Sequence, residues 1–403
     1  MSDTDRLLEI ADAVGTPTYV YDAPHMRGRI KRLERALEDV DHHTCYAVKA
    51  NDALAMIKIA ALGGLGADVV SGGELLKALR AGIRPEDIVF SGIGKQRDEI
   101  EIALDVKVRS LNVESRQELD LVAEVARAHG TTARVSVRVN PAVEAGTHRY
   151  ISTGHAGSKF GIPIDEATGA FRYAADSSSL NPIGMSFHVG SQLLDTSPIT
   201  SAAKAAAALW RELEHDGIEL EDFDAGGGLG VPYEGGEEAN LEAYLTPLAM
   251  IASSLDATLV LELGRWLTAE AGVLLSTVLY TKQLGDRWIA VCDAGMNDLL
   301  RPALYEAWHP INVLTAHDSR PLVSVDVVGP VCESGDFFAL ARELPRPKQG
   351  DLIAVGFAGA YSRVMSSTYN ARPLAAEVLI DDAIWRTIRK RPTIDDLSAG
   401  ESL

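Results

Sequence analysis

The sequence is poor in cysteine and in positive charge, and each shortage excludes a class of protein. Its 403 residues include only Cys45, Cys292 and Cys332, which are too few and too scattered for a disulfide framework or a zinc site. Lysine and arginine total 38 against 57 acidic residues, giving a net charge of −19. Non-specific nucleic-acid binding needs a basic surface, so no nucleic-acid partner is expected. The small number of cysteines likewise gives no reason to expect a metal.

Long apolar runs are also lacking. No apolar run approaches the roughly 20 residues that span a bilayer, and the first residues lack the basic and then apolar layout of a signal peptide. We therefore expect a cytoplasmic protein without a membrane partner. Hydrophobic residues make up 46% and charged residues 24% of the chain, as is ordinary for a globular protein. The length suffices for two domains, or for one barrel with an appendage.

Strand-like apolar runs alternate with helical patterns from Thr44 onward. Eight runs are typical of strands: Thr44–Val48, Ala67–Val70, Ile88–Ser91, Ser110–Val113, Arg134–Val139, Gly184–His188, Phe223–Ala225 and Thr258–Leu263. Helical patterns separate them, among them Leu54–Leu62, Gly73–Ala81, Arg97–Leu104, Ser115–Arg127, Ser201–Glu214 and Leu241–Leu255. Eight strands alternating with helices predict an α/β fold, a parallel (β/α)8 barrel over residues 27–270.

The pattern changes after about Gly272. Short β-rich runs then follow without long helices between them: Val273–Thr281, Trp288–Asp293, Leu322–Val328, Leu352–Val355 and Ala375–Ile380. This shift predicts a C-terminal all-β domain of ordinary size. The early strand at Thr18–Asp22 precedes the barrel and can pair into that domain, which would then comprise residues 1–26 and 271–403.

The carboxyl ends of the predicted strands bring polar and glycine-rich segments to one rim, where the active sites of such barrels lie. The residues at these ends are Lys49, Asp68, His188 with Ser191, Gly226–Gly228, and Glu262 with Gly264 and Arg265. Each motif alone is weak evidence for an active site. A single lysine is more often a solvated loop residue, a single histidine is more often a hydrogen-bonded core residue, and a triple glycine is more often a tight turn.

Together these residues indicate a site for pyridoxal phosphate. A lysine at the mouth of an apolar strand can be desolvated, which favours a nucleophilic amine that forms a Schiff base with an aldehyde. The backbone N–H groups of Gly227 and Gly228 can bind a phosphate, since no side chain blocks the approach. Glu262 would be costly to bury without a cation, and a protonated pyridine ring is one. A cofactor-free, aldolase-type lysine would use the same fold but would leave Glu262 unexplained.

The chain resembles a known family, the alanine-racemase-like pyridoxal phosphate decarboxylases of fold type III. The matching motifs occur in the family's order: Tyr46-Ala47-Val48-Lys49-Ala50-Asn51, Lys159-Phe160-Gly161, His188-Val189-Gly190-Ser191, Gly226-Gly227-Gly228, Glu262 with Gly264-Arg265, Cys332-Glu333-Ser334-Gly335-Asp336, Gly359-Ala360-Tyr361 and Tyr369-Asn370. Other segments are similar to the branch that converts meso-2,6-diaminopimelate to L-lysine and carbon dioxide, the last step of lysine biosynthesis. These are Tyr150-Ile151-Ser152-Thr153-Gly154, Asp293-Ala294-Gly295-Met296-Asn297-Asp298 and Arg301-Pro302-Ala303-Leu304-Tyr305.

The resemblance implies a role for each site residue. Lys49 would hold the cofactor's aldehyde, His188 would stack on its ring, and Glu262 would keep the ring nitrogen protonated. The rest of the cofactor site would be formed by Asp68, Ser191, Gly227, Gly228, Gly264, Arg265 and Tyr361. The amino-acid substrate would be bound by Arg265, Arg301 and Tyr305 at its distal carboxylate, by Glu333 at its distal ammonium, and along its length by Tyr369. Cys332, from the other subunit of a homodimer, would protonate the carbanion.

One residue departs from the family's pattern. The family usually has Glu-Pro-Gly-Arg after the eighth strand, and Leu263 stands here in place of the proline. Because proline mainly stiffens a turn, its replacement by Leu263 should leave the cofactor contacts intact. The property that this replacement could change is the preference for one substrate over another. The alternative is therefore a related decarboxylase of another amino acid, ornithine- or arginine-like or carrier-protein-bound glutamate. A non-catalytic cofactor-binding barrel and an amino-acid racemase are weaker alternatives, since the Cys332-Glu333 segment argues against both.

Overall fold

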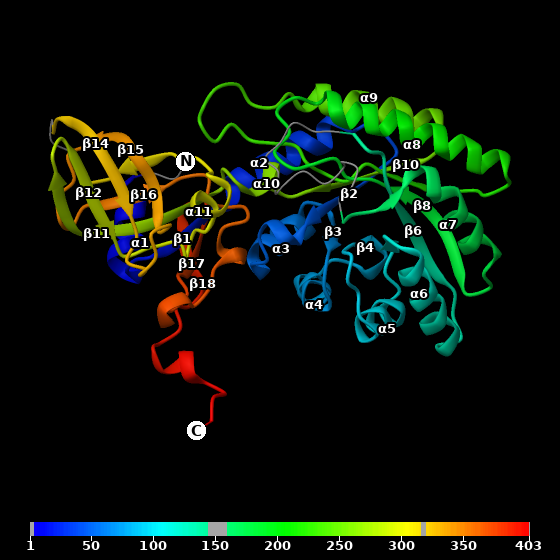
Figure 1. The fold of residues 1–403 in the computed structure, drawn as a ribbon, viewed down its shortest axis with the longest axis horizontal. Coiled ribbons are helices and arrows are strands. Elements are labelled where there is room, and N and C mark those ends of the chain that lie inside the picture. Colours follow the sequence, from blue (N-terminus) through cyan, green and yellow to red (C-terminus); the bar gives the residue numbers. More distant parts are fainter. Residues whose placement is uncertain (1–3, 144–158, 316–319, 403) are drawn as a thin grey trace. The chain divides into compact units, whose positions relative to one another are not determined.

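The computed structural model of this chain describes residues 4–143, 159–315 and 320–402, and it forms two compact units (Figure 1). The barrel unit comprises Arg29–Pro232 and Glu237–Trp266. The β unit comprises Met1–Gly28, Tyr233–Gly236 and Leu267–Leu403. The four residues Tyr233–Gly236 thus lie within the barrel's part of the sequence but belong to the β unit.

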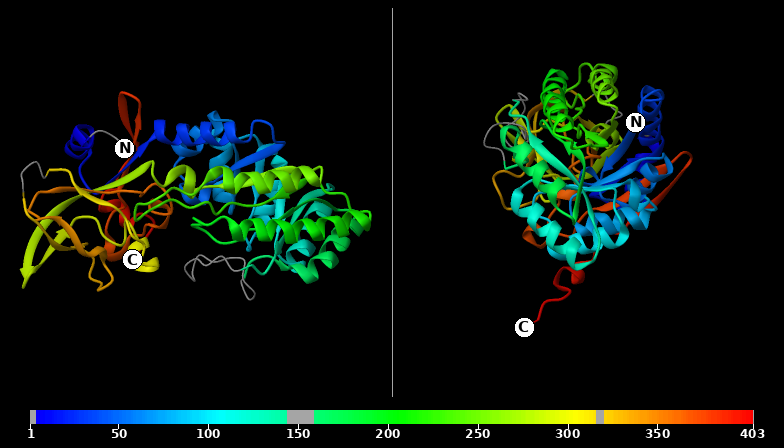
Figure 2. Two further views of the ribbon diagram at one scale, coloured as in Figure 1. Left: turned by 90° about the horizontal axis from the view of Figure 1, so that it is seen from above. Right: turned by 90° about the vertical axis from the view of Figure 1, so that its right-hand side faces the viewer.

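Eight parallel strands close into a barrel, as the sequence predicted. In chain order they are β2 (His42–Ala47), β3 (Gly66–Val69), β4 (Ile88–Phe90), β5 (Ser110–Val113), β6 (Ala133–Asn140), β8 (Leu180–Ser186), β9 (Asp222–Asp224) and β10 (Thr258–Leu263). Their order around the barrel is β5-β4-β3-β2-β10-β9-β8-β6, and pairing of β5 with β6 closes it. The short β7 (Ile162–Pro163) adds to β6. In the right-hand view of Figure 2, helices form a ring around these strands.

The helices of the barrel begin and end at recognisable signals. They are α2 (Ala23–Ala36, which starts in the β unit), α3 (Leu54–Leu62), α4 (Gly72–Ala81), α5 (Arg97–Val106), α6 (Arg116–Ala128), α7 (Ile164–Asp176), α8 (Ser197–His215), α9 (Leu241–Ser254) and α10 (Arg265–Thr268, which ends in the β unit). Ser71 caps α4 by accepting a hydrogen bond from Glu74 N (3.2 Å), and Gly82 ends it at a φ of 93°. Within the described ranges, no helix is long and apolar enough to cross a membrane.

The β unit is a nine-stranded mixed sheet. Its strands are β1 (Thr18–Asp22), β11 (Gly272–Leu284), β12 (Arg287–Cys292), β13 (Ile311–Val313), β14 (Leu322–Val328), β15 (Phe337–Pro345), β16 (Leu352–Val355), β17 (Ala376–Asp381) and β18 (Ile384–Arg389). The main path runs β15-β14-β12-β11-β1-β17-β18, with β16 joined to β11 and β13. β1 lies between antiparallel β11 and parallel β17, so the prediction that the N-terminal strand joins this domain is confirmed.

The core of the β unit lies between this sheet and α1 (Thr4–Val14), where Leu7 and Ile10 pack on Val20, Leu275 and Val378. The sequence did not predict three of the strands, β13, β15 and β18. β15 and β18 form the two ends of the main path, and β18 has no fully buried residue. An edge strand of this kind needs no apolar run, which explains why the pattern missed it.

Candidate active site

Lys49 lies immediately beyond the carboxyl end of β2. The sequence predicted a strand as far as Val48, but β2 ends at Ala47 and Lys49 lies in the 3-10 turn Val48–Ala50. The turn is fixed locally, because the Tyr46 hydroxyl donates to Asn51 O (2.7 Å). The partly exposed Lys49 ammonium forms an ion pair with Asp68, a fully buried carboxylate on β3. The neighbouring strand therefore orients the amine at the barrel mouth.

His188 lies two residues beyond β8 and is partly buried. Its Nδ1 accepts a hydrogen bond from Gly227 N (3.1 Å), so this nitrogen carries a lone pair. Burial, and then the positive charges of Arg138 and Lys49, hold the pKa of His188 well below its usual range. The ring is therefore a neutral, flat surface at neutral pH.

Glu262 belongs to a buried polar network inside the barrel. Ser91 Oγ donates to Glu262 Oε1 (3.1 Å), and Asn112 Nδ2 donates to Asp224 Oδ2 (3.1 Å). Burial, and then the neighbouring carboxyls Asp224 and Asp68, raise the pKa of Glu262 well above its usual range. Burial also raises the pKa of Asp224 to about 6. A cation beside Glu262 would restore its ionised form.

The glycine run after β9 is required by close packing of the backbone. A Cβ on Gly227 would lie 2.2 Å from Glu262 O, and one on Gly228, whose φ is 105°, would lie 2.7 Å from Gly190 O. Any side chain here would force the ends of β8, β9 and β10 apart. The N–H groups of Gly226 and Gly227 donate to Asp224 and His188, whereas Gly228 is partly exposed and has backbone of the kind that binds a phosphate at the carboxyl ends of barrel strands.

Arg265 and Leu263 lie at the end of β10. Arg265 Nη2 donates to Ser191 Oγ (2.9 Å), which connects the loops after β8 and β10. Leu263 pairs in register with Tyr46 and is almost fully buried. Leucine in place of the family's proline is thus accommodated within the regular pairing of β10 with β2.

These barrel residues fit pyridoxal phosphate. The strands that carry them, β2, β10, β9 and β8, are consecutive neighbours in the barrel, and β3 adjoins β2. Together they offer an oriented amine (Lys49), a neutral flat ring (His188) and glycine backbone. They also offer a buried carboxyl, Glu262, whose raised pKa marks the need for a cationic partner. A phosphorylated pyridine aldehyde complements each of these features: its aldehyde suits the amine, its ring the imidazole, its phosphate the glycine backbone, and its ring nitrogen the carboxyl.

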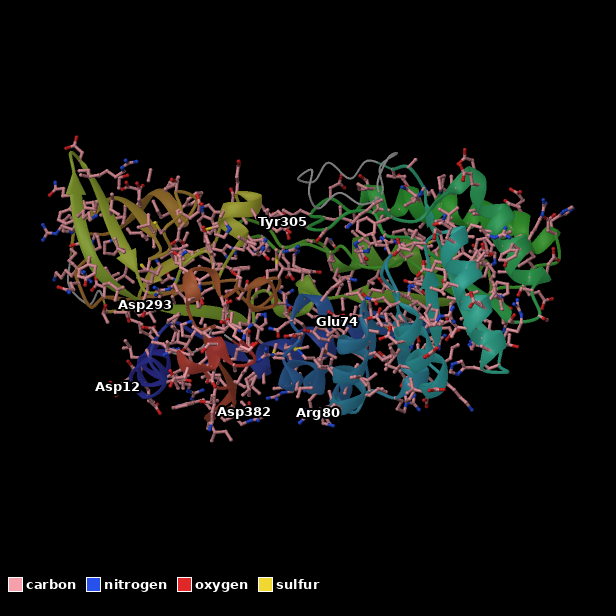
Figure 3. All side chains as sticks on the ribbon, turned by 60° about the horizontal axis from the view of Figure 1, so that its bottom comes forward. Asp12, Glu74, Arg80, Asp293, Tyr305 and Asp382 are labelled. Carbon is pink, nitrogen blue, oxygen red and sulfur yellow. The ribbon has the colours of Figure 1, made fainter. Side chains whose placement is uncertain are left out.

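A second group of predicted residues lies in the β unit. Arg301 and Tyr305 are the first and last residues of the short helix α11 (Arg301–Tyr305; Tyr305 is labelled in Figure 3). Arg301 is buried, and its Nη1 lies 2.8 Å from His309 Nε2. Its guanidinium carbon also lies 4.3 Å from the centre of the Tyr233 ring.

The Cys332 turn follows β14 and is fixed by Asp336. This carboxylate accepts hydrogen bonds from Met296 N and Val331 N, both at 2.6 Å. Cys332 N donates to Asn370 Oδ1 (2.8 Å), and Cys332 itself is exposed. The turn therefore presents its thiol at the surface, unlike Cys45 and Cys292, which are buried.

The remaining predicted residues of the β unit lie in two loops. Glu333 is exposed beside Cys332, and Tyr369 is 44% exposed in the segment that contains Asn370. Tyr361 has a φ of 52°, an uncommon backbone conformation for a side chain of this size. Such strain is frequent at functional sites.

The Asp293–Asp298 segment, which the sequence singled out, connects these loops. Asp293 (labelled in Figure 3) accepts hydrogen bonds from Ser276 Oγ (2.6 Å) and Thr277 N (2.9 Å) of β11. Ser366 Oγ donates to Asp298 O (2.8 Å). This loop therefore supports the segments that carry Cys332 and Tyr369. The other singled-out motif, Tyr150 to Gly154, lies outside the described residues.

The predicted site thus forms two groups of residues, one in each unit. The barrel group contains Lys49, Asp68, His188, Ser191, Gly227, Gly228, Glu262, Gly264 and Arg265, and the β group contains Arg301, Tyr305, Cys332, Glu333, Tyr361 and Tyr369. Sequence reasoning missed Asn112, Asp224 and His309. Asn112 and Asp224 each follow an apolar residue in a short, fully buried strand, which is a usable signal of an inward-facing polar group, whereas nothing around His309 distinguishes it from a loop residue.

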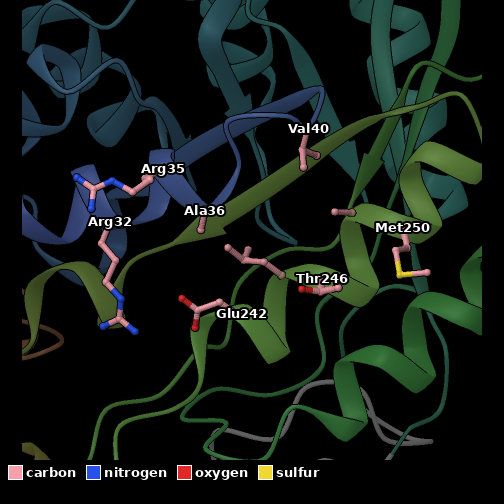
Figure 4. A pocket seen from close by; sticks show the side chains of 9 residues that line it. Arg32, Arg35, Ala36, Val40, Glu242, Thr246 and Met250 are labelled. Atoms are coloured by element: carbon pink, nitrogen blue, oxygen red, sulfur yellow. The ribbon is translucent and has the colours of Figure 1, made fainter.

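A pocket on the barrel unit lies away from these residues. Its cavity, about 620 Å³, is lined from α2 by Arg32 and Arg35 and from α9 by Glu242 and Met250 (Figure 4). Val40, which precedes β2, also lines it, so the pocket lies toward the amino ends of the strands. Barrel active sites lie at the opposite ends, so this pocket is not a candidate for the reaction.

Comparisons with known proteins agree with this geometry. The family model described as "Pyridoxal-dependent decarboxylase, pyridoxal binding domain" matches residues 24–269. The chain is 45% identical to the diaminopimelate decarboxylase of Pseudomonas aeruginosa over 397 residues, which cover 98% of this chain and 95% of that protein. The Helicobacter pylori diaminopimelate decarboxylase, solved with L-lysine, has a TM-score of 0.94 at 42% identity and 98% coverage of both chains. SrLDC, solved with PLP and cadaverine, has a TM-score of 0.83 at 26% identity and 95% coverage of both.

Proposed function

The chain belongs to the pyridoxal-dependent decarboxylase family, and from that premise we propose that it converts meso-2,6-diaminopimelate to L-lysine and carbon dioxide. The observation that carries the proposal is likeness over almost the whole length, β unit included, to enzymes named diaminopimelate decarboxylase. A cofactor-binding barrel alone would not need the buried Arg301 and the exposed Cys332 turn.

The barrel residues prepare the site for chemistry that the cofactor supplies. Bound pyridoxal phosphate provides an aldehyde that captures the substrate's amine and a ring that accepts the electron pair left when carbon dioxide departs. Lys49 holds the aldehyde until substrate arrives, and Asp68 orients its amine. Neutral His188 covers one ring face without adding charge, and Glu262 keeps the proton on the ring nitrogen. Gly228 and Ser191 would receive the phosphate.

The β-unit residues recognise the end of the substrate that does not react. Arg301, with Arg265 of the barrel and Tyr305, receives the distal carboxylate, and Glu333 receives the distal ammonium. A guanidinium binds a carboxylate through two parallel hydrogen bonds. An amino acid without the distal carboxylate lacks these contacts and is a poor substrate. Cys332 returns a proton to the reacting carbon.

The exposure of the Cys332 turn supports a homodimer with shared sites. Cys332, Glu333 and Tyr369 are all exposed. The adjoining Asn370 and Ala371 both have left-handed backbone conformations, with φ values of 56° and 51°. A strained turn that presents a thiol to solvent is suited to completing a site in a second copy of the chain.

A biosynthetic role with a small free substrate favours the cytoplasm.

Carbon dioxide release from a panel of amino acids tests the proposal. The purified protein with pyridoxal phosphate is given meso-diaminopimelate, L-lysine, L-ornithine, L-arginine and L-glutamate side by side. We expect kcat/KM for meso-diaminopimelate to exceed that for each other amino acid by at least about a hundredfold, because each of the others lacks contacts made by the distal end of meso-diaminopimelate. Preference for ornithine, arginine or glutamate would instead favour the alternative that Leu263 raised.

A further inference from the structure

We infer that His309 is a positioning residue for Arg301, and that it thereby sets the enzyme's selectivity for a substrate with a distal carboxylate. The inference rests on the proposed function, since it concerns the substrate end that Arg301 receives. His309 lies four residues beyond α11, immediately before Pro310 and β13. It is completely buried.

Hydrogen bonds on both sides of the ring fix its protonation. Arg301 Nη1 lies 2.8 Å from His309 Nε2, and a guanidinium can only donate, so Nε2 must be the acceptor. His309 Nδ1 lies 2.8 Å from Gly356 O, a carbonyl that can only accept, so Nδ1 carries the hydrogen. The imidazole is therefore neutral. Its two hydrogen bonds connect the backbone carbonyl of Gly356 to the Arg301 guanidinium.

The strand pairing of the β unit places His309 at this position. β13 pairs with β16, and the pairing extends past both strands because Gly356 N donates to Pro310 O (2.8 Å). This contact places Gly356 O beside the His309 ring. A Cβ on Gly356 would lie 2.8 Å from Pro310 Cγ, so a side chain here would press on the residue that follows His309.

Tyr233 completes the support from another direction. Its ring centre lies 4.3 Å from the Arg301 guanidinium carbon and 5.2 Å from the centre of the His309 ring, which it meets edge-on. The Arg301 guanidinium thus lies over the Tyr233 ring and is hydrogen-bonded to His309. A guanidinium held in this way has its orientation fixed before a carboxylate arrives, which reduces the ordering cost of binding.

The neutrality of His309 explains why a histidine suits this position. An aspartate or glutamate here would also accept a hydrogen bond from Arg301, but its negative charge would compete with the substrate's carboxylate. The neutral imidazole accepts the same bond without bringing a negative charge to the guanidinium. We therefore expect His309 to act on substrate binding and not on the chemical step.

Steady-state kinetics of two variants test this role. His309→Leu removes the acceptor, and we expect KM for meso-diaminopimelate to rise about tenfold while kcat changes less than about twofold, as for a lost hydrogen bond to a charged group. His309→Gln can present an oxygen to Arg301 and an N–H to Gly356 O, and it should restore most of the loss. His43→Leu is the matched control: His43 lies near the amino end of β2, and its Nε2 donates to Asp87 O (3.3 Å). It should leave KM unchanged.

Product inhibition separates recognition of the carboxylate from a general loss of structure. L-Lysine keeps the distal carboxylate, because only the carboxylate at the reacting carbon leaves, whereas cadaverine lacks it. In His309→Leu the inhibition constant of L-lysine should rise about tenfold, and that of cadaverine should stay the same. Equal weakening of both ligands, or no rescue by glutamine, would overturn the inference. Absence of diaminopimelate decarboxylation by the unmodified protein would instead overturn the proposed function.

Discussion

Single buried residues of the barrel act through the protonation state that burial imposes on them. His188 is neutral because burial and two neighbouring cations oppose its charge. The pKa of Glu262 is raised by its burial, and then by the neighbouring carboxyls Asp224 and Asp68. In each case the strand or loop that carries the residue determines its burial, and burial in turn determines the charge that a ligand meets.

Glu74 on α4 (labelled in Figure 3) provides a test of such burial outside the reacting groups. Burial raises its pKa from 4.5 to about 7, and its Oε2 accepts a hydrogen bond from Val70 N (2.9 Å). Because the folded-state pKa lies above the unfolded value, its stabilising effect is complete below about pH 4.5 and is lost as pH rises through 7.

Glu74→Gln should therefore match the unmodified protein at pH 4 and be more stable at pH 8. Glutamine keeps an acceptor for Val70 N without a charge, and the gain should approach about 3 kcal/mol. Urea unfolding midpoints at the two pH values measure it. The exposed Glu86→Gln is the control, and a difference between Glu74→Gln and the unmodified protein that is independent of pH would contradict the assignment.

The positions of Lys49, His188 and Glu262 could be predicted from the sequence, because a polar residue that ends an apolar run marks the mouth of a parallel barrel. The partners of Glu262 could not. Asn112 and Asp224 lie on β5 and β9, which are not neighbours in the sheet, and they meet only because the barrel closes. A linear pattern contains no information about contacts across a closed interior.

Among elements, the loop after β9 shows how backbone packing creates a binding surface. Gly227→Ala would place a Cβ 2.2 Å from Glu262 O, so either β10 or the loop must move. We expect the affinity of the apoprotein for pyridoxal phosphate to fall at least about tenfold, since the phosphate contacts and Glu262 would shift together.

Absorbance titration of the apoprotein with pyridoxal phosphate measures this change. Gly169→Ala on α7 is the matched control, because no atom lies within 4 Å of its added Cβ. That substitution should leave affinity unchanged and stabilise the helix by about 1 kcal/mol. Unchanged cofactor affinity in Gly227→Ala would mean that the loop does not contribute to the cofactor site.

The predictability of an element depended on its burial. α3 was predicted with its observed bounds, Leu54–Leu62, because its apolar residues are dense. β13 was missed because only one of its three residues is buried, and with it the role of His309 was missed. Contacts that depend on a short strand pairing become visible only in three dimensions.

At the scale of the whole molecule, the predicted site is divided between two units, and the proposed dimer can be tested by mixing inactive chains. Lys49→Ala lacks the amine and Cys332→Ala lacks the thiol. In a twofold dimer with shared sites, a mixed dimer has one site with both defects and one with neither. After unfolding and refolding an equal mixture, about a quarter of the unmodified activity should return, because half of the dimers are mixed.

Two controls define the outcome of that experiment. The single variants refolded alone should stay near their own low activities. Lys49→Ala mixed with the double variant Lys49→Ala/Cys332→Ala should show no recovery, since no intact site can form. Recovery absent from the first mixture, with dimers present by sedimentation, would show that each chain builds its site alone.

The place of β1 in its sheet determines an order of assembly during synthesis. β1 pairs on one side with Gly272–Leu275 and on the other with Ala376–Ile380. The second of these neighbours lies more than 350 residues from β1 in the sequence. The barrel strands, between His42 and Leu263, can pair as soon as they leave the ribosome. β1 must therefore wait unpaired until Gly272–Leu275 are made, and one of its edges stays open until Ala376–Ile380 are made, so the apolar Tyr19-Val20-Tyr21 segment needs protection in the newborn protein.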